Sequence, residues 1–296
     1  MTLHPTQSSP VGERPVTAPP SKSPPVTRRI RRRVRGVDPI PWWLKLFVAL
    51  VAVYLILPTV FVIPMSFGST RSFAFPPKNL TFDLYRNFFS DERWLTSLQN
   101  SVVVGLLAAL IATVVGTAAA VGLHHLRGKP AQIIRALLMV PLVAPAIVIA
   151  VAVYISFLKW HLVGTLQGYV LAHAAIAVPF VLVAVTSSLS NFDSNLLRAS
   201  ASLGASPSRT FRRVTMPLIG KGILSGAVFA FVTSFDEVVI ALFLRDPTFQ
   251  TMPVQMYNSV TYEIDPTMAA ASSLVVVVVT VVCLGLQLLG SRTKKR

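Results

Sequence analysis

Six long runs of apolar residues constrain this chain more than any other feature. A helix needs about 20 apolar residues to cross the hydrocarbon core of a bilayer. The runs are Leu46–Met65, Leu98–Leu123, Ala136–Leu158, Leu166–Ser188, Gly222–Leu244 and Met268–Gly290. Backbone groups in lipid must find partners within the protein, and runs this long and continuous predict helices rather than barrel strands. The sequence therefore predicts an all-α membrane protein with six transmembrane helices.

The charged residues predict which way these helices run. Only 13% of the residues are charged, against about 25% in an ordinary soluble domain. Lysine and arginine are concentrated in alternate segments, namely the N-terminal tail, residues 124–135, residues 189–221 and the C-terminal tail. Because positively charged loops stay in the cytoplasm, we expect both termini to be cytoplasmic. The net charge of +16 then reflects topology, and no nucleic-acid partner is expected.

The membrane domain is expected to span residues 42–291, between two polar tails. Residues 1–41 are Pro-rich and then strongly basic, a composition that cannot bury a core, so we expect a disordered cytoplasmic tail. Its basic run, Arg28–Arg35, suits a cytoplasmic anchor, and the alternative is a nucleic-acid or specific lipid contact. Residues 292–296 form a second basic tail.

The first loop on the opposite side, residues 66–97, is rich in aromatic residues at helical spacing. They are Phe82, Tyr85, Phe88, Phe89 and Trp94. This pattern favours a short helix at the membrane interface with its aromatic rings at headgroup level. The alternative is direct contact with a protein that delivers substrate.

The segment 189–221 predicts a helix, a glycine turn and a second helix. Asp193 is a suitable N-cap, and Gly204 suits the left-handed position that ends a helix. One face of the intervening helix is expected to carry Leu196, Ala199, Ser200 and Leu203.

The second helix of this loop is expected to begin at Ser206-Pro207 and to be closed by Pro217. It would present Phe211 and Val214 on one side, with Arg209, Arg212 and Arg213 largely elsewhere. The pattern fits a docking element with a face of small residues. It fits equally an amphipathic connector whose arginines touch anionic lipid.

The stretch RASASLGA, from Arg198 to Ala205, and the interval from Gly204 to Pro217 resemble the "EAA" loop of binding-protein-dependent ABC importer permeases. The resemblance implies the type I importer permease (MetI-like) fold, with this loop forming coupling helices that dock in a groove of the ATPase. It assigns ATPase coupling to Arg198, Ala199, Ser200, Leu203, Gly204, Ala205, Phe211 and Pro217. The family's usual glutamate is Arg198 here, and its second alanine is Ser200. The reversed charge indicates an acidic group on the cognate ATPase, or a glutamate role that is taken elsewhere.

Two acids interrupt the fifth apolar run, at Asp236 and Glu237. A charged side chain near the centre of a membrane helix costs about 2.5–3.5 kcal/mol, so such residues normally face protein or a water-filled cavity. Adjacent residues of a helix point about 100° apart, so one acid is expected to face a pathway while the other accepts hydrogen bonds or meets a partner subunit. The alternative is a structural pair satisfied by a donor such as His173, which we expect to be an interhelical donor.

The segments around these acids (residues 234–239), in the first external loop (73–89) and after the fifth span (251–260) resemble the C-type permease subunit of spermidine/putrescine importers. That resemblance implies a substrate pathway with Ser234, Asp236 and Glu237, and a small cationic cargo such as a polyamine. Relatives implied for opines, amino-acid-like compounds or iron stay open. So does an ion-coupled secondary transporter, which would need inverted repeats.

The resemblance also implies the partners of the chain. They are a second, B-type permease in a heterodimer, two ATPase subunits, an extracytoplasmic substrate-binding protein and the lipid of the bacterial inner membrane. The chain contains no G-x-x-x-x-G-K-[ST] loop, so ATP and Mg are expected on the partner ATPase. We expect no catalytic residue, cofactor or metal site in this chain.

Overall fold

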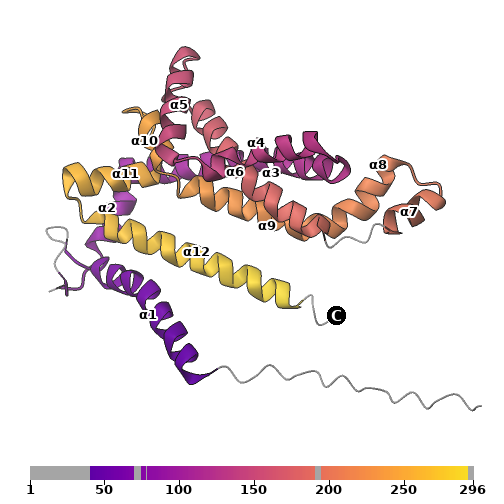
Figure 1. Cartoon of the computed structure of the whole chain (residues 1–296). Coiled ribbons are helices and arrows are strands. Elements are labelled where there is room, and N and C mark those ends of the chain that lie inside the picture. The colour runs from indigo at the N-terminus through magenta and orange to yellow at the C-terminus, as the bar shows by residue number, and fades with distance from the viewer. Residues whose placement is uncertain (1–40, 70–74, 78, 191–194, 293–296) are drawn as a thin grey trace, which may run out of the picture. The chain divides into compact units, whose positions relative to one another are not determined.

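Three long helices pack against one another at the centre of the structure. They are α3 (Glu92–His125), α6 (Leu166–Ser190) and α9 (Met216–Phe235), and each contacts the other two (Figure 1). Shorter helices lie at both ends of this bundle, with α7 and α8 at one end and α10 and α11 at the other (Figure 1). The bundle therefore holds two groups of short helices apart.

The computed structural model describes residues 41–69, 75–77, 79–190 and 195–292, with side chains as far as residue 281. The chain divides into two units, Met1–Ala52 and Val53–Arg296, and helix α1 (Trp42–Met65) contributes to both. The remaining helices of the described residues are α2 (Asp83–Ser90), α4 (Lys129–Val143), α5 (Ala146–Lys159), α7 (Asn195–Ser202), α8 (Pro207–Thr210), α10 (Val239–Leu244), α11 (Met252–Asn258) and α12 (Thr267–Arg292), with π-helical turns η1 (Phe211–Thr215) and η2 (Ser259–Glu263). The predicted tails, 1–41 and 292–296, lie almost wholly outside the described residues.

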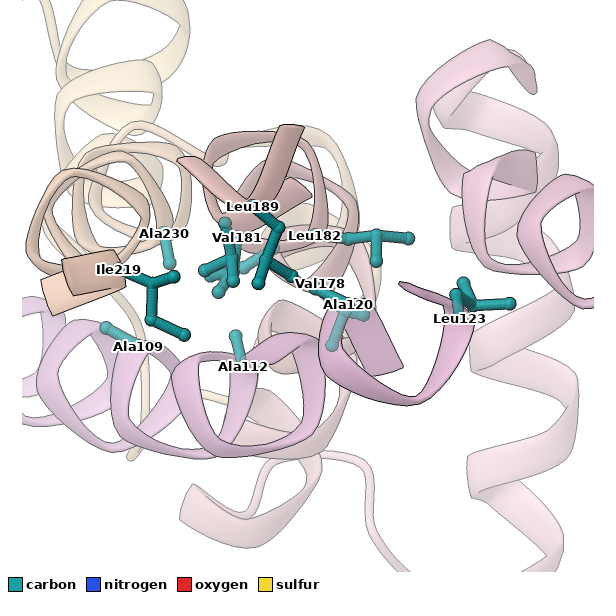
Figure 2. Close-up of a cluster of buried hydrophobic side chains, with 12 residues drawn as sticks. Ala109, Ala112, Ala120, Leu123, Val178, Val181, Leu182, Leu189, Ile219 and Ala230 are labelled. Atoms are coloured by element: carbon teal, nitrogen blue, oxygen red, sulfur yellow. The ribbon is translucent and has the colours of Figure 1, made fainter. Parts of the chain in front are cut away.

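The bundle core is built from small and branched apolar side chains of α3, α6 and α9 (Figure 2). Val181 of α6 is fully buried where the three helices meet. A Cβ atom added at Gly116 of α3 would lie 2.7 Å from the Val181 Cβ, and one added at Gly226 of α9 would lie 3.0 Å from its Cα. The two glycines therefore let both neighbouring helices approach α6 closely, as small residues do in membrane helix bundles.

Among the residues that the structure describes, four helices are long and apolar enough to cross a membrane. They are Trp42–Met65, Glu92–His125, Leu166–Ser190 and the continuous stretch Pro207–Phe235. A fifth span is present if α4 and α5 together form one. The part of α12 with described side chains, Thr267–Val281, is apolar but shorter. The helical class is confirmed, while the count of six and the position of the termini stay predictions.

The predicted third span, Ala136–Leu158, is not one straight helix. Helices α4 and α5 meet at an angle of 102°, with Ala144 extended between them. Pro145 follows directly, and a proline sterically disfavours helical backbone at the residue before it. The bend is therefore a local consequence of the Ala144-Pro145 pair.

The predicted fifth span, Gly222–Leu244, is not one helix and does not begin at Gly222, although its outer end coincides with the end of α10. Helix α9 ends at Phe235, and α10 begins only at Val239. On the other side Pro217 does not close a helix, because α8, η1 and α9 run on from Pro207 as one continuous stretch. A proline in a helix removes one N–H donor and crowds the preceding turn. Here the wider π-helical turn η1, in which the Met216 N–H donates to the Phe211 carbonyl, comes directly before it.

The aromatic residues of the 66–97 loop do not all lie at a surface. The expected short helix is present as α2, and Phe82 and Phe89 are exposed. Phe88 and Trp94, however, are buried against Met252 of α11. These two rings fix the loop to the helices behind it and are not free for headgroups or for a delivery protein.

The close contact at Val181 leads to a stability prediction. Gly116→Val should lower the thermal stability of the purified protein in detergent by about 1–3 kcal/mol, because an overpacked core must shift its backbone. The matched control is Gly122→Val on the same helix, where a Cβ would meet nothing within 4 Å. Equal melting temperatures for the two variants would show that the α3–α6 approach does not limit stability.

Candidate functional site

The two acids lie in a break between helices rather than inside one. Residues 236–238 are not helical. The Glu237 carboxylate turns back onto α10, where Oε1 accepts the Ile240 N–H at 2.8 Å and Oε2 accepts the Ala241 N–H at 2.9 Å. A carboxylate is favourable at a helix N-terminus because it satisfies free N–H groups and meets the positive end of the helix dipole. Glu237 therefore holds the start of α10.

His173 connects this cap to the bundle. Its side chain is fully buried on α6, with Nδ1 2.9 Å from the Ser234 Oγ and 3.1 Å from the Ser234 carbonyl oxygen. On the other side of the ring, Nε2 lies 3.7 Å from Glu237 Oε2, beyond hydrogen-bond range. His173 therefore makes the expected interhelical contact, through Ser234, while the tautomer decides whether its Nδ1 donates or accepts.

Ser234 is consequently not on an open surface. It was expected along a substrate pathway, but only 3% of it is exposed and its hydroxyl faces the His173 ring. The structure places Ser234 inside the contact between α6 and α9.

Asp236 has the opposite environment. Its side chain is exposed and makes no hydrogen bond or ion pair with any described residue. It lies on a hollow of about 390 Å³ between the α9–α10 break, α11 and α12. The other lining residues are mostly apolar, namely Phe235, Val238, Met252, Pro253, Met256, Ser272, Val275 and Val276. The hollow thus has one unpaired carboxylate in an apolar wall.

The expectation that one acid accepts hydrogen bonds is met by Glu237. The reasoning behind it was wrong, since it placed both acids on one continuous helix. The 100° separation does not apply to residues 236–238, because the backbone has left the helix. The two acids differ because the free N–H groups of Ile240 and Ala241 donate to Glu237 and not to Asp236.

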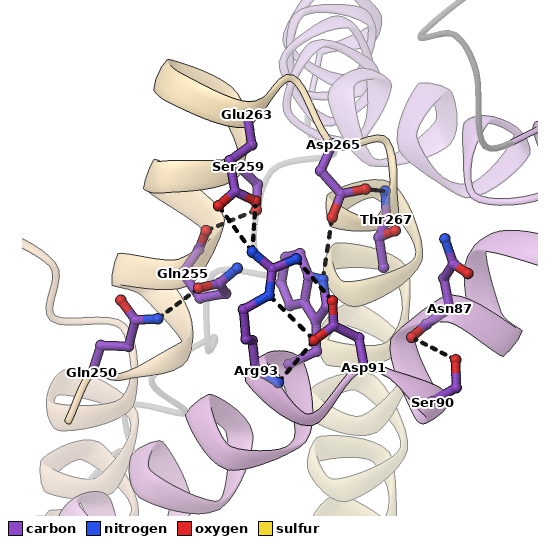
Figure 3. Close-up of polar contacts among 11 residues, drawn as sticks. Asn87, Ser90, Asp91, Arg93, Gln250, Gln255, Ser259, Glu263, Asp265 and Thr267 are labelled. Carbon is purple, nitrogen blue, oxygen red and sulfur yellow. Dashed lines mark hydrogen bonds and ion pairs between the residues drawn. The ribbon is translucent and has the colours of Figure 1, made fainter. Parts of the chain in front are cut away.

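A polar network ties the same end of the bundle together (Figure 3). Arg93 bridges Asp91 at the start of α3 and Glu263 of η2, with N–O distances of 2.9 and 3.0 Å. The Trp94 indole N–H points to the Asp265 carboxylate at 3.3 Å. The hydrogen bonds from Arg93 hold the pKa of Asp91 below its usual range. The network fixes η2 and the start of α12 beside α3.

The predicted coupling loop lies at the other end of the bundle. Helix α7 ends in a Schellman motif, in which the Ala205 N–H donates to the Ser200 carbonyl at 3.1 Å and the Gly204 N–H to the Ala201 carbonyl at 2.9 Å. Gly204 has φ +75°, so the left-handed position predicted for it is confirmed. The predicted N-cap Asp193 lies outside the described residues.

The side chains of the coupling loop divide into outward and inward groups. Ala199 and Leu203 are exposed, Leu203 by 87%. Leu197, Ala205 and Phe211 are partly buried and line a hollow of about 270 Å³ between the loop and the ends of α3 and α6, and the exposed Ala201 lies at its edge. Ser200 does not join the outward group, because its hydroxyl lies 2.7 Å from the Thr210 hydroxyl of α8.

Two further expected loop residues, Arg198 and Pro217, are exposed. Thr210 was missed from the sequence. Its only signal was a second hydroxyl ten residues after Ser200, which does not reveal contact between two helices. Among the described residues, no group of three or more His, Cys, Asp or Glu is arranged to hold a metal ion.

The chain is similar to several curated transport proteins. It is 28% identical over 246 residues to the spermidine/putrescine transport system permease protein PotC of Escherichia coli (strain K12), covering 82% of this chain and 92% of that protein. It is 29% identical over 205 residues to the putrescine transport system permease protein PotI of the same strain, covering 67% and 73%. It is 27% identical over 242 residues to the trehalose transport system permease protein SugB of Mycobacterium tuberculosis (strain CDC 1551 / Oshkosh), covering 79% and 87%.

The fold is shared with a solved structure. A chain of a bacterial ABC transporter involved in the import of the acidic polysaccharide alginate superposes with a TM-score of 0.64. The match covers 83% of this chain and 94% of that one at 14% sequence identity, so it shows common architecture only. The expected permease architecture is supported at the level of the fold.

A family model decides the membership. The model of the binding-protein-dependent transport system inner membrane component matches residues 112–295, which include both the predicted coupling loop and the Asp236–Val238 break. The chain therefore belongs to the binding-protein-dependent transport system inner membrane components, and is a multi-pass permease subunit of a bacterial ABC importer whose ATPase is a separate chain.

Proposed function

We propose that this permease subunit forms half of a translocation pathway for a small organic cation such as a polyamine. The observation that carries the proposal is the unpaired Asp236 carboxylate in the apolar hollow beside α11 and α12. Two of the relatives carry putrescine or spermidine in their names, which supports the same cargo.

The environment of Asp236 favours a positively charged chain molecule. A carboxylate in a membrane-embedded site is unfavourable unless it finds a partner. Glu237 has two backbone donors, whereas Asp236 has no partner among the described residues. An ammonium group would pair with Asp236, while its methylene chain would lie against Met256 and Val275. Glu237 is then a structural residue that keeps the break open at Asp236.

The proposed assembly contains four other kinds of component. A related B-type permease would pair with this chain, two ATPase subunits would dock on the loop from residue 193 to residue 221, and a binding protein would deliver the cargo. Both termini and this loop would be cytoplasmic. ATP binding and hydrolysis by the partner would move the loop and switch the pathway between its two openings.

Charge at position 236 should control transport of cations. Asp236→Asn keeps the shape of the side chain but removes its charge, and uptake of labelled putrescine at low concentration should fall about tenfold or more, as expected for loss of a charge-assisted contact. The matched control is Asp83→Asn on α2, an exposed acid away from the hollow. Unchanged uptake by Asp236→Asn, or preferential uptake of trehalose by the wild type, would contradict the cation pathway.

Glu237 should matter for stability rather than for cargo charge. Glu237→Ala removes the acceptors for the Ile240 and Ala241 N–H groups and should destabilise the protein by about 1–2 kcal/mol, the usual effect of losing a helix cap. Asp236→Ala should leave the melting temperature unchanged. If both alanine variants melt alike, the proposed division between the two acids is wrong.

The Gly204 turn should be needed for coupling. Gly204→Asp puts an L side chain at φ +75° on the docking loop and should abolish uptake while the protein still inserts and its ATPase partner still hydrolyses ATP. Gly128→Asp is a matched control, because Gly128 has φ +82° in the turn before α4. Wild-type transport by Gly204→Asp, or equal loss in both variants, would remove the coupling role from this turn.

A further inference from the structure

The outward side of the coupling loop is basic on both flanks. In helix α7, Arg198 and Ser200 point about 100° to either side of Ala199. Ser200 is bonded to Thr210, so α8 packs on that flank and Arg198 occupies the opposite one. Between them the exposed Ala199 and Leu203 form a narrow apolar strip.

Helix α8 and the following turn add three more arginines. Arg209, Arg212 and Arg213 are exposed and line a shallow hollow of about 260 Å³ together with Ser206 and Ser208. None of these arginines, nor Arg198, lies within ion-pair distance of a described carboxylate. Arginines arranged around a hollow are suited to bidentate contacts with carboxylates.

The combination of apolar and basic residues favours a protein partner. Leu203 is 87% exposed on α7 and would otherwise face water. Arginines alone would suit anionic lipid headgroups as well. An apolar strip flanked by arginines suits a protein surface that offers both close packing and carboxylates, and the ATPase of this permease is a separate chain.

We infer that the arginines of this loop enter an acidic groove of the importer's ATPase subunit. The permease then carries the positive charges of the contact and the ATPase carries the negative ones. The inference rests on the proposed coupling function and adds the chemistry of the partner surface. The apolar strip of Ala199 and Leu203 provides close packing, and the flanking arginines set the orientation and the choice of partner. An ATPase with a basic or neutral groove would bind more weakly, because the arginines of the loop would be left unpaired in the contact.

The inference is tested by zero-length cross-linking in the assembled importer. Arg198→Lys and Arg212→Lys preserve the charge but supply an amine, which a carbodiimide joins to a carboxylate only on direct contact. Co-purified permease and ATPase in phosphatidylcholine vesicles should give a new cross-linked product at each position, mapped by mass spectrometry. Arg127→Lys, an exposed arginine in the turn between α3 and α4, should give none.

A charge reversal supplies the second readout. The double variant Arg198→Glu, Arg212→Glu should retain about tenfold less ATPase at low salt than the wild type, and the wild type should itself lose ATPase as salt rises. Three results together would overturn the acidic groove while leaving coupling intact. They are full retention of the ATPase by the double variant, no cross-link at positions 198 and 212, and no loss of ATPase as salt rises. Retention that depends on phosphatidylglycerol in the vesicles would assign the arginines to lipid. A wild-type permease that captures no ATPase would instead reject the proposed coupling function.

Discussion

The arrangement of this permease depends on the crossing of three helices at Val181. Between membrane helices, lipid supplies no hydrophobic driving force, so association must come from close packing. Gly116 and Gly226 permit that packing from α3 and α9, because a Cβ at Gly116 would lie 2.7 Å from the Val181 Cβ and one at Gly226 would lie 3.0 Å from the Val181 Cα. Once α6 is fixed between α3 and α9, the two ends of the bundle are fixed as well. The short helices at each end then need only local contacts.

At one end of the bundle, local hydrogen bonds accommodate one of the two adjacent acids of this membrane protein. Leaving the helix at Asp236 exposes the N-terminal N–H groups of α10, and those groups are the donors that Glu237 needs. The break and the acid therefore stabilise each other. His173 lies between this cap and Ser234, which anchors the break to α6. Asp236 is left with a carboxylate that pairs with no described residue, and the proposed cation contact rests on this.

The sequence predicted those features that local chemistry determines. Apolar length identified the helices, and the Gly204 turn followed from its position after a helical face. Features that depend on neighbouring helices were missed. The run Ala136–Leu158 is uniformly apolar, and only the Ala144-Pro145 pair signals its 102° bend. Pro217 was expected to end a helix because the π-helical turn that accommodates it has no sequence signature. The burial of Ser234, likewise, is decided by His173, which is 61 residues away.

The continuity of the helix past Pro217 changes how the two ends can communicate. One uninterrupted stretch runs from Pro207, beside the docking loop, to Phe235, beside the Asp236 carboxylate, a length of roughly 40 Å. A helix that ended at Pro217 would have put a flexible joint between the arginines and the membrane. Instead, a force on α8 in the proposed coupling would be transmitted along a single element whose far end is the start of the break. Because Gly226 packs against Val181, α6 must follow or resist that movement, and α6 carries His173. In the proposed coupling, a displacement of the loop would therefore reach the Glu237 cap by two routes, through α9 directly and through the His173 side of α6.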